Sequence, residues 1–233
     1  MPLLGKFDNL RFGRSFTWCW ALALGCGTSS LTLVAGAAPL RPADEGRQRY
    51  SDQLSVARNA YFKVITSNDE IADQQAHAAL EELEREYPGD PVAKAYHGSL
   101  LMLDAAHNWA VWNLHKQTSE GLGMLDAAVA EGPDEPEARF IRAATSWHLP
   151  SFYRRKAQCE ADFALLAGRV EIDARRGKLP PALAAASFNY WGQILVNRKD
   201  LGGARIAFES AVRIASDSPG GLDAGKRLRA LQR

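Results

Sequence analysis

The sequence predicts an all-α fold of stacked helical hairpins, and two observations carry that prediction. Apolar residues recur at three- and four-residue steps through most of the chain, which is the spacing of one face of an amphipathic helix. A short pattern also repeats, in which a small residue is followed by large and then small or apolar residues. It occurs at Ala76, Leu80 and Leu83; Gly121, Leu125 and Ala128; Cys159, Phe163 and Leu166; and Ala204, Phe208 and Ala211. A repeated helical pattern indicates helix pairs that stack on one another.

The composition is that of a globular chain with little net charge. The 233 residues are 46% hydrophobic, which is enough for a packed core. Residues 1–38 carry three bases and one acid, so the remainder carries 25 bases and 26 acids. Because nucleic-acid binding depends on a basic surface, this balance argues against a nucleic-acid partner.

Residues 1–38 resemble an export signal. Basic residues precede an apolar stretch, and Ala35 and Ala37 form a small-residue exit that suits cleavage before Ala38. A second interpretation is a lipoprotein signal, in which Cys26 is the lipidated residue and the only link to a membrane. A third is an uncleaved anchor, although residues 25–30 interrupt the apolar run. We therefore expect export to the periplasm, either as a free domain or as one anchored there.

Residues 39–43 are predicted to be a linker, and residues 44–233 to be the helical repeat domain. Prolines at helix starts, a glycine C-cap at Gly177 and N-caps near Asp69 and at Asp200 separate the helical segments. The segments expected to be helical are 44–65, 71–87, 91–102, 122–131, 138–148, 154–174, 181–195, 201–212 and a short capping helix over 222–233. No segment shows sustained period-two alternation, so we expect no sheet.

These residues resemble the tetratricopeptide repeat (TPR), a unit of about 34 residues. The last unit fits the repeat without gaps, with Phe188, Trp191, Gly192 and Leu195 on its first helix and Ala204, Phe208 and Ala211 on its second. The resemblance implies a TPR-like α-solenoid of about four hairpins plus the capping helix. It also implies that Gly192 packs against Ala204, since small residues allow two helices to approach closely. As an exported repeat chain, the protein is similar to uncharacterised bacterial envelope proteins of this family.

The second unit departs from the repeat by an insertion. Eleven extra residues separate Gly98 from Gly121, and the inserted stretch, residues 104–118, contains Trp109 and Trp112. We expect it to leave the end of a first helix and reach over the groove. There the two tryptophans either contact a partner, as Trp often does at interfaces, or fold back and plug the groove.

In the tetratricopeptide family the first helix of each hairpin lines a binding groove. The resemblance therefore implies a groove wall that joins aromatic, amide and small side chains and suits an extended peptide. The expected wall residues are Ser99, Met102, Phe140, Ala144, Trp147, Asn189 and Gln193.

Two arginines occupy positions that are usually apolar in the repeat. Arg139 and Arg142 are three residues apart on the fifth predicted helix. One interpretation is an anion clamp in the groove. The other is internal pairing with Glu137, Asp126 or Asp162, with the aliphatic stems packed on neighbouring helices.

The sequence contains no pattern that points to catalysis. None of the five histidines belongs to a recognisable metal-ligand motif, and neither a phosphate-binding glycine loop nor a nucleophile elbow is present. We therefore expect a non-enzymatic scaffold without metal or cofactor that binds a protein or peptide partner in the cell envelope. The alternatives are a structural subunit of an envelope assembly, which would use its convex surface, and a helical repeat protein that binds a small molecule.

Overall fold

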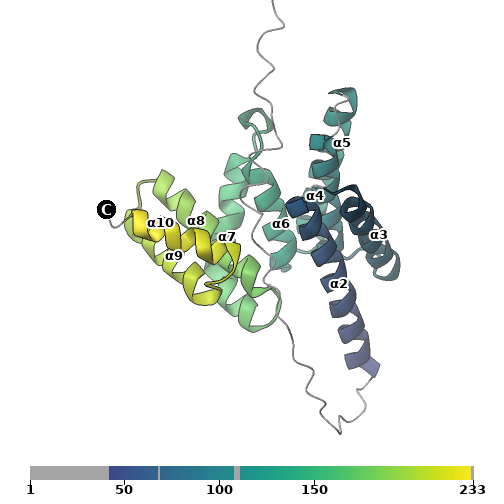
Figure 1. Ribbon diagram of the computed structural model, residues 1–233, viewed down its shortest axis with the longest axis horizontal. Helices are drawn as coiled ribbons and strands as arrows, with labels where there is room; N and C mark the ends of the chain where they lie inside the picture. Colours follow the sequence, from purple (N-terminus) through teal and green to yellow (C-terminus); the bar gives the residue numbers. More distant parts are fainter. Residues whose placement is uncertain (1–41, 68, 108–110, 232–233) are drawn as a thin grey trace, which may run out of the picture.

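The computed structural model describes residues 42–67, 69–107 and 111–231, with the side chains of residues 42–43 and 106–114 excepted. Over these residues the chain is helical, with no strand, as the sequence predicts (Figure 1). The predicted signal segment, residues 1–38, and most of the linker lie outside the described residues. Within the described part, no helix combines the length and apolar character needed to cross a bilayer.

The helices follow the predicted segments closely. They are α2 (Pro42–Ser67), α3 (Glu70–Glu86), α4 (Pro91–His107), α5 (Val111–Glu131), α6 (Pro136–Trp147), the 3-10 turn η1 (Ser151–Tyr153), α7 (Lys156–Arg175), α8 (Pro181–Asn197), α9 (Leu201–Ile214) and α10 (Pro219–Ala230). The predicted capping residues act as expected at two helix starts. The carboxylate of Asp69 accepts a hydrogen bond from the Ile71 N–H, and that of Asp200 accepts one from the Gly203 N–H. Gly177, after α7, has a φ of 71°, the left-handed conformation that favours glycine at such a position.

Three predicted helix boundaries are wrong. The stretch between the helices predicted at 91–102 and 122–131 is largely helical, because α4 continues to His107 and α5 already begins at Val111. Most of the extra residues therefore lengthen the second hairpin, and α5 extends past its neighbours in Figure 1. The last helix begins at Pro219 instead of residue 222, because the Ser218 hydroxyl caps it by accepting from the Gly221 N–H.

The helices pack as successive antiparallel pairs. The pairs α2–α3, α4–α5, α6–α7 and α8–α9 are in extensive contact, and α10 covers α8 and α9. Neighbouring pairs meet chiefly through α4 on α6 and α7 on α8, so each pair touches mainly the pairs next to it in sequence. Figure 1 accordingly shows the first two pairs at one end of the molecule and α8–α10 at the other.

Small residues allow the helices of a pair to approach closely. A β-carbon placed on Gly98 of α4 would lie 2.9 Å from the Gly121 carbonyl oxygen of α5, and one on Gly121 would lie 2.6 Å from the Gly98 carbonyl oxygen. Gly121 belongs to the predicted pattern. In the α8–α9 pair, the closest neighbour of Gly192 is Phe208 and not the expected Ala204. The atoms nearest to a β-carbon at Gly192 belong to the Phe208 ring, at 2.5–2.9 Å, and Ala204 is not among them.

Candidate functional site

The expected groove wall is closed at its centre by the chain itself. Ser99 and Phe140 are buried, as are Met102, Ala144 and Asn189, so the expectation that they form an open groove wall is wrong for this structure. Different helices cover different wall residues: Phe140 packs on Phe163 of α7, and α2 places the Tyr61 ring against α4 at Ser99. The Tyr61 hydroxyl is 2.7 Å from the Ser99 hydroxyl.

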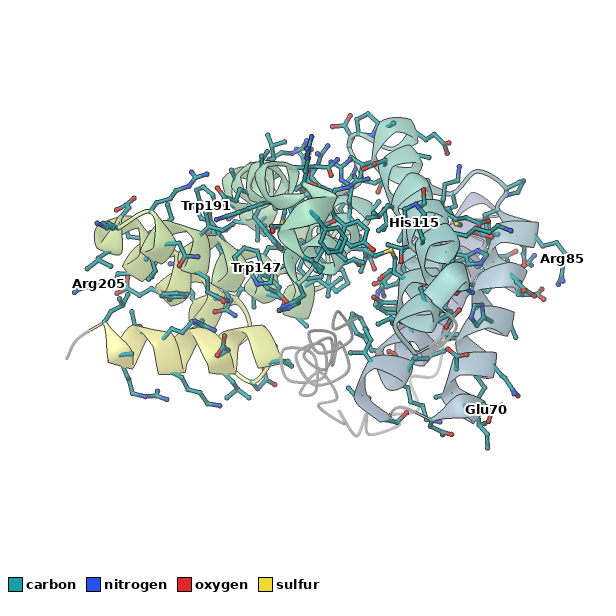
Figure 2. The ribbon with its side chains drawn as sticks, turned by 90° about the horizontal axis from the view of Figure 1, so that it is seen from above. Glu70, Arg85, His115, Trp147, Trp191 and Arg205 are labelled. Atoms are coloured by element: carbon teal, nitrogen blue, oxygen red, sulfur yellow. The ribbon has the colours of Figure 1, made fainter. Side chains whose placement is uncertain are left out.

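Two residues of the predicted wall remain half-buried. The Trp147 ring packs 5.4 Å from the Tyr190 ring and 6.1 Å from that of Phe163, and it lies near the middle of the molecule between the ends marked by Arg205 and Arg85 (Figure 2). Gln193 donates to the Asn189 carbonyl oxygen at 3.4 Å. These two are the wall positions that keep some contact with solvent.

Helix α10 covers Asn189, the other amide residue of the expected wall. The Asn189 side chain donates to the Asp223 carboxylate of α10 at 2.9 Å, so its amide nitrogen already has a partner. Trp109 lies outside the described residues, and the side chain of Trp112 does as well. The two alternatives for the insertion, plugging or lining the groove, therefore stay predictions.

A buried carboxylate joins α2, α4 and α6, which are the first helices of three successive pairs. Glu137 of α6 is only 3% exposed, and it accepts two hydrogen bonds from Arg58 of α2 at 2.7 and 2.8 Å and one from the Tyr96 hydroxyl of α4 at 2.7 Å. Burial raises the pKa of the Tyr96 hydroxyl well above its ordinary value, and the Glu137 charge adds to this effect. Tyr96 therefore stays a neutral donor to Glu137.

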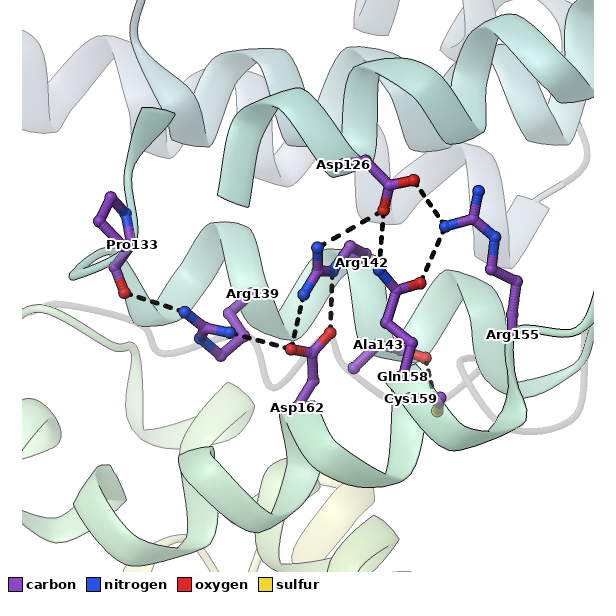
Figure 3. Close-up of polar contacts among 9 residues, drawn as sticks. All are labelled: Asp126, Pro133, Arg139, Arg142, Ala143, Arg155, Gln158, Cys159 and Asp162. Carbon is purple, nitrogen blue, oxygen red and sulfur yellow. Dashed lines mark hydrogen bonds and ion pairs between the residues drawn. The ribbon is translucent and has the colours of Figure 1, made fainter. Parts of the chain in front are cut away.

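Arg139 and Arg142 are paired within the chain (Figure 3). The Asp162 carboxylate, 3% exposed, accepts from Arg139 at 3.0 Å and from Arg142 at 2.7 and 2.8 Å. Arg142 also reaches Asp126, at 3.4 Å, so two of the three expected partners are present. Glu137, the third, binds Arg58 instead. An external anion would therefore have to compete with a buried carboxylate for both guanidinium groups.

The same network extends to the next helix. Asp126 of α5 accepts from Arg155 at 2.6 Å and from the Gln158 amide at 2.9 Å. The network thus ties α5, α6 and α7 together (Figure 3). Beside it lies a small cavity of about 60 Å³ between the α5–α6 turn and α7, which has room for a few water molecules. Asp173 lines this cavity with one buried oxygen that has no hydrogen-bond partner.

Cys159 is a small buried residue of the kind expected at this repeat position. Its thiol is 3.2 Å from the Ala143 carbonyl oxygen, and burial raises its pKa to about 12. A thiol with that pKa is almost entirely protonated at neutral pH and is a poor nucleophile. Cys26, the alternative lipidation site, lies outside the described residues.

A cluster that the sequence analysis missed joins α3 to α4. One ligand-type atom each from Asp73, His77 and Asp104 lie within 4.8 Å of one another. His77 Nε2 is 2.9 Å from an Asp104 oxygen, and the hydrogen bond to this carboxylate is the main cause that raises the pKa of His77. The sequence signal is the four-residue step from Asp73 to His77, which places both on one face of a helix. Asp104 could not be added without knowing how the two helices pack.

A second histidine lies beside this cluster. The His97 ring of α4 is 6.1 Å from that of His77 and nearly perpendicular to it, and His97 Nδ1 is 3.0 Å from a Glu84 carboxylate oxygen. That hydrogen bond is the main cause that raises the pKa of His97.

Comparison with known proteins adds no assignment: no family model, curated protein or solved structure matches this chain.

Proposed function

We propose that this chain is a non-enzymatic helical scaffold of the tetratricopeptide type that binds a protein or peptide partner in the bacterial cell envelope. The observation that carries the proposal is a row of hydroxyl groups on three first helices. The Ser99 hydroxyl of α4 is 2.7 Å from the Tyr61 hydroxyl of α2 and 2.7 Å from the Thr145 hydroxyl of α6. Residues at matching levels of successive first helices are what a stack of repeats requires.

The second helices support the same arrangement. Glu160 and Glu171 of α7 bind Arg198, just before α9, and Arg213, near its end. The partners are 38 and 42 residues apart in sequence. Because both separations are similar and follow the same order along each helix, α7 and α9 run in the same direction, which is the arrangement expected for the second helices of consecutive repeats.

The partner surface is not the buried centre of the groove wall. What remains on that side is the half-buried pair Trp147 and Gln193. The outer helices offer more apolar surface: Leu165 on α7 is 54% exposed and Ile206 on α9 is 65% exposed. This observation favours the second candidate function, a structural subunit of an assembly that uses its outer helices.

Site-specific photocrosslinking separates these two functions. A photoreactive residue is placed at Gln193 for the groove side, at Leu165 and Ile206 for the outer side, and at exposed Glu45 as a control. The experiment is done in cells that express the protein natively, with identification by mass spectrometry. A partner protein that crosslinks to the probe at Gln193 supports the peptide-binding scaffold. A partner protein that crosslinks to the probes at both Leu165 and Ile206 supports the assembly subunit. No product above the Glu45 control would refute both.

Export is tested independently by the N-terminus of the native protein. Cleavage after Ala37 predicts a terminus near Ala38, and the lipoprotein interpretation predicts a diacylated Cys26. Mass spectrometry of protein purified from the envelope fraction distinguishes the two, whereas an intact Met1 in the cytosol contradicts both.

A further inference from the structure

The strongest chemistry outside the groove is the histidine and carboxylate cluster between α3 and α4. Asp73 and His77 stand one turn apart on α3, and Asp104 faces them from α4. All three side chains are half-buried, so they are partly desolvated but still reachable from solvent. A mixed set of one imidazole and two carboxylates is a donor set that first-row transition metals bind.

The distances suit a metal ion after small side-chain movements. In a tetrahedral zinc site the ligand atoms lie about 2.0–2.1 Å from the ion, and hence about 3.3 Å from one another. The 2.9 Å contact between His77 and Asp104 is a hydrogen bond, so a bound ion would take the place of the shared proton and open this contact slightly. The widest separation, under 4.8 Å, closes by rotation of an aspartate side chain.

His97 supplies the independent observation. Its Nδ1 is held by the Glu84 carboxylate at 3.0 Å, which leaves Nε2 as the nitrogen that can bind a metal. Metal-binding histidines in proteins commonly have such a carboxylate on the other ring nitrogen, because it fixes the tautomer and the ring orientation. His97 lies outside the group of ligand atoms that are within 4.8 Å of one another, and its ring centroid is 6.1 Å from that of His77, so its ring would have to move toward the ion to become a ligand.

We propose that α3 and α4 bind one divalent transition-metal ion, of which Zn²⁺ fits best, through Asp73, His77 and Asp104, with His97 as the fourth ligand. Four protein ligands make a closed site, which is characteristic of structural zinc. The ion would fasten the first helix pair to the second, since α3 belongs to one and α4 to the other. This goes beyond the proposed scaffold function and does not depend on it.

The test is a calorimetric titration of the untagged, chelator-treated full chain with Zn²⁺ alone. Because Cys19 and Cys26 are thiols that also bind zinc, the titration is repeated in a Cys19→Ser, Cys26→Ser background. We expect one equivalent of Zn²⁺ to bind and the melting temperature to rise with it. His77→Ala and Asp104→Asn should each weaken binding at least about tenfold, a loss of the size that even outer-shell changes cause in metal sites.

Matched controls keep the result interpretable. His115→Ala removes an exposed histidine of α5, and Glu82→Gln removes an exposed carboxylate of α3; both should leave zinc affinity unchanged. Circular dichroism in the absence of metal shows whether each variant is folded. Equal affinity in wild type, His77→Ala and Asp104→Asn, or no stoichiometric binding, overturns the site. Unchanged affinity in His97→Ala overturns the fourth ligand.

Discussion

Replacing Gly192 with alanine should destabilise the α8–α9 pair, and the structure gives the size of the effect. The added methyl group would lie 2.5–2.9 Å from three atoms of the Phe208 ring, where about 3.4 Å or more is ordinary contact. The ring cannot move away easily, because Phe208 is 1% exposed and packed in the core. Overpacking of this kind costs about 1–3 kcal/mol.

The same substitution also has a favourable component that must be removed from the measurement. Alanine is a better helix former than glycine by about 1 kcal/mol in a helix interior. Gly168→Ala on α7 is the matched control, since nothing lies within 4 Å of a β-carbon there. We therefore expect Gly168→Ala to gain about 1 kcal/mol and Gly192→Ala to be about 1–3 kcal/mol less stable than that control.

Urea unfolding followed by circular dichroism measures both variants, with a melting temperature as a second readout. For a chain of this size each kcal/mol corresponds to about 2–4 °C. Phe208→Leu combined with Gly192→Ala should recover part of the loss, because the smaller side chain gives the methyl group room. If Gly192→Ala is as stable as Gly168→Ala, the contact between the two helices is not as described.

Three further predictions concern buried charge, pH and the thiol. Asp162→Asn removes the charge shared by two mostly buried arginines and should lower the free energy of unfolding in urea by about 3 kcal/mol. Asp134→Asn, at an exposed ion pair, should lower it by less than about 1 kcal/mol. Equal losses in the two variants would contradict the network. Burial lowers the pKa of His148, so on acidification this histidine is protonated in the unfolded chain before it is protonated in the folded one. The free energy of unfolding of wild type should therefore fall relative to that of His148→Gln as the pH decreases from about 7.5 through the ordinary histidine pKa near 6.5. Parallel pH profiles of the two free energies of unfolding would refute this. Cys159, with its pKa raised to about 12, should resist iodoacetamide at pH 8 until urea is added, as followed by peptide mass mapping, and rapid native labelling would show the site to be open.

Local features of this fold were predictable from sequence because they depend on neighbours along the chain. The caps at Asp69 and Asp200 and the glycine at 177 follow from backbone geometry at helix ends. The close approach of Gly98 and Gly121 follows from the repeated small-residue pattern.

The candidate sites depend on contacts between distant segments, and there the sequence was less informative. The groove wall was expected to be open because a repeat pattern says which helix lines it, but not how far Tyr61 of α2 reaches over Ser99. The cluster of Asp73, His77 and Asp104 was missed because Asp104 meets His77 only through the packing of α4 on α3. Internal pairing of Arg142 was one of the two interpretations, since a guanidinium at a core position requires a carboxylate close by, and Asp162 supplies it.

The position of Glu137 has a consequence for how the chain reaches its native state. Arg58 is made 79 residues before the carboxylate that binds it. At a synthesis rate of about 5–20 residues per second, α2 waits roughly 4–16 s before α6 exists. During that interval the apolar face that carries Tyr61 has only part of its final cover. Among the described helices, α2 is therefore made first, but its contact with Glu137 can form only after α6 has been made.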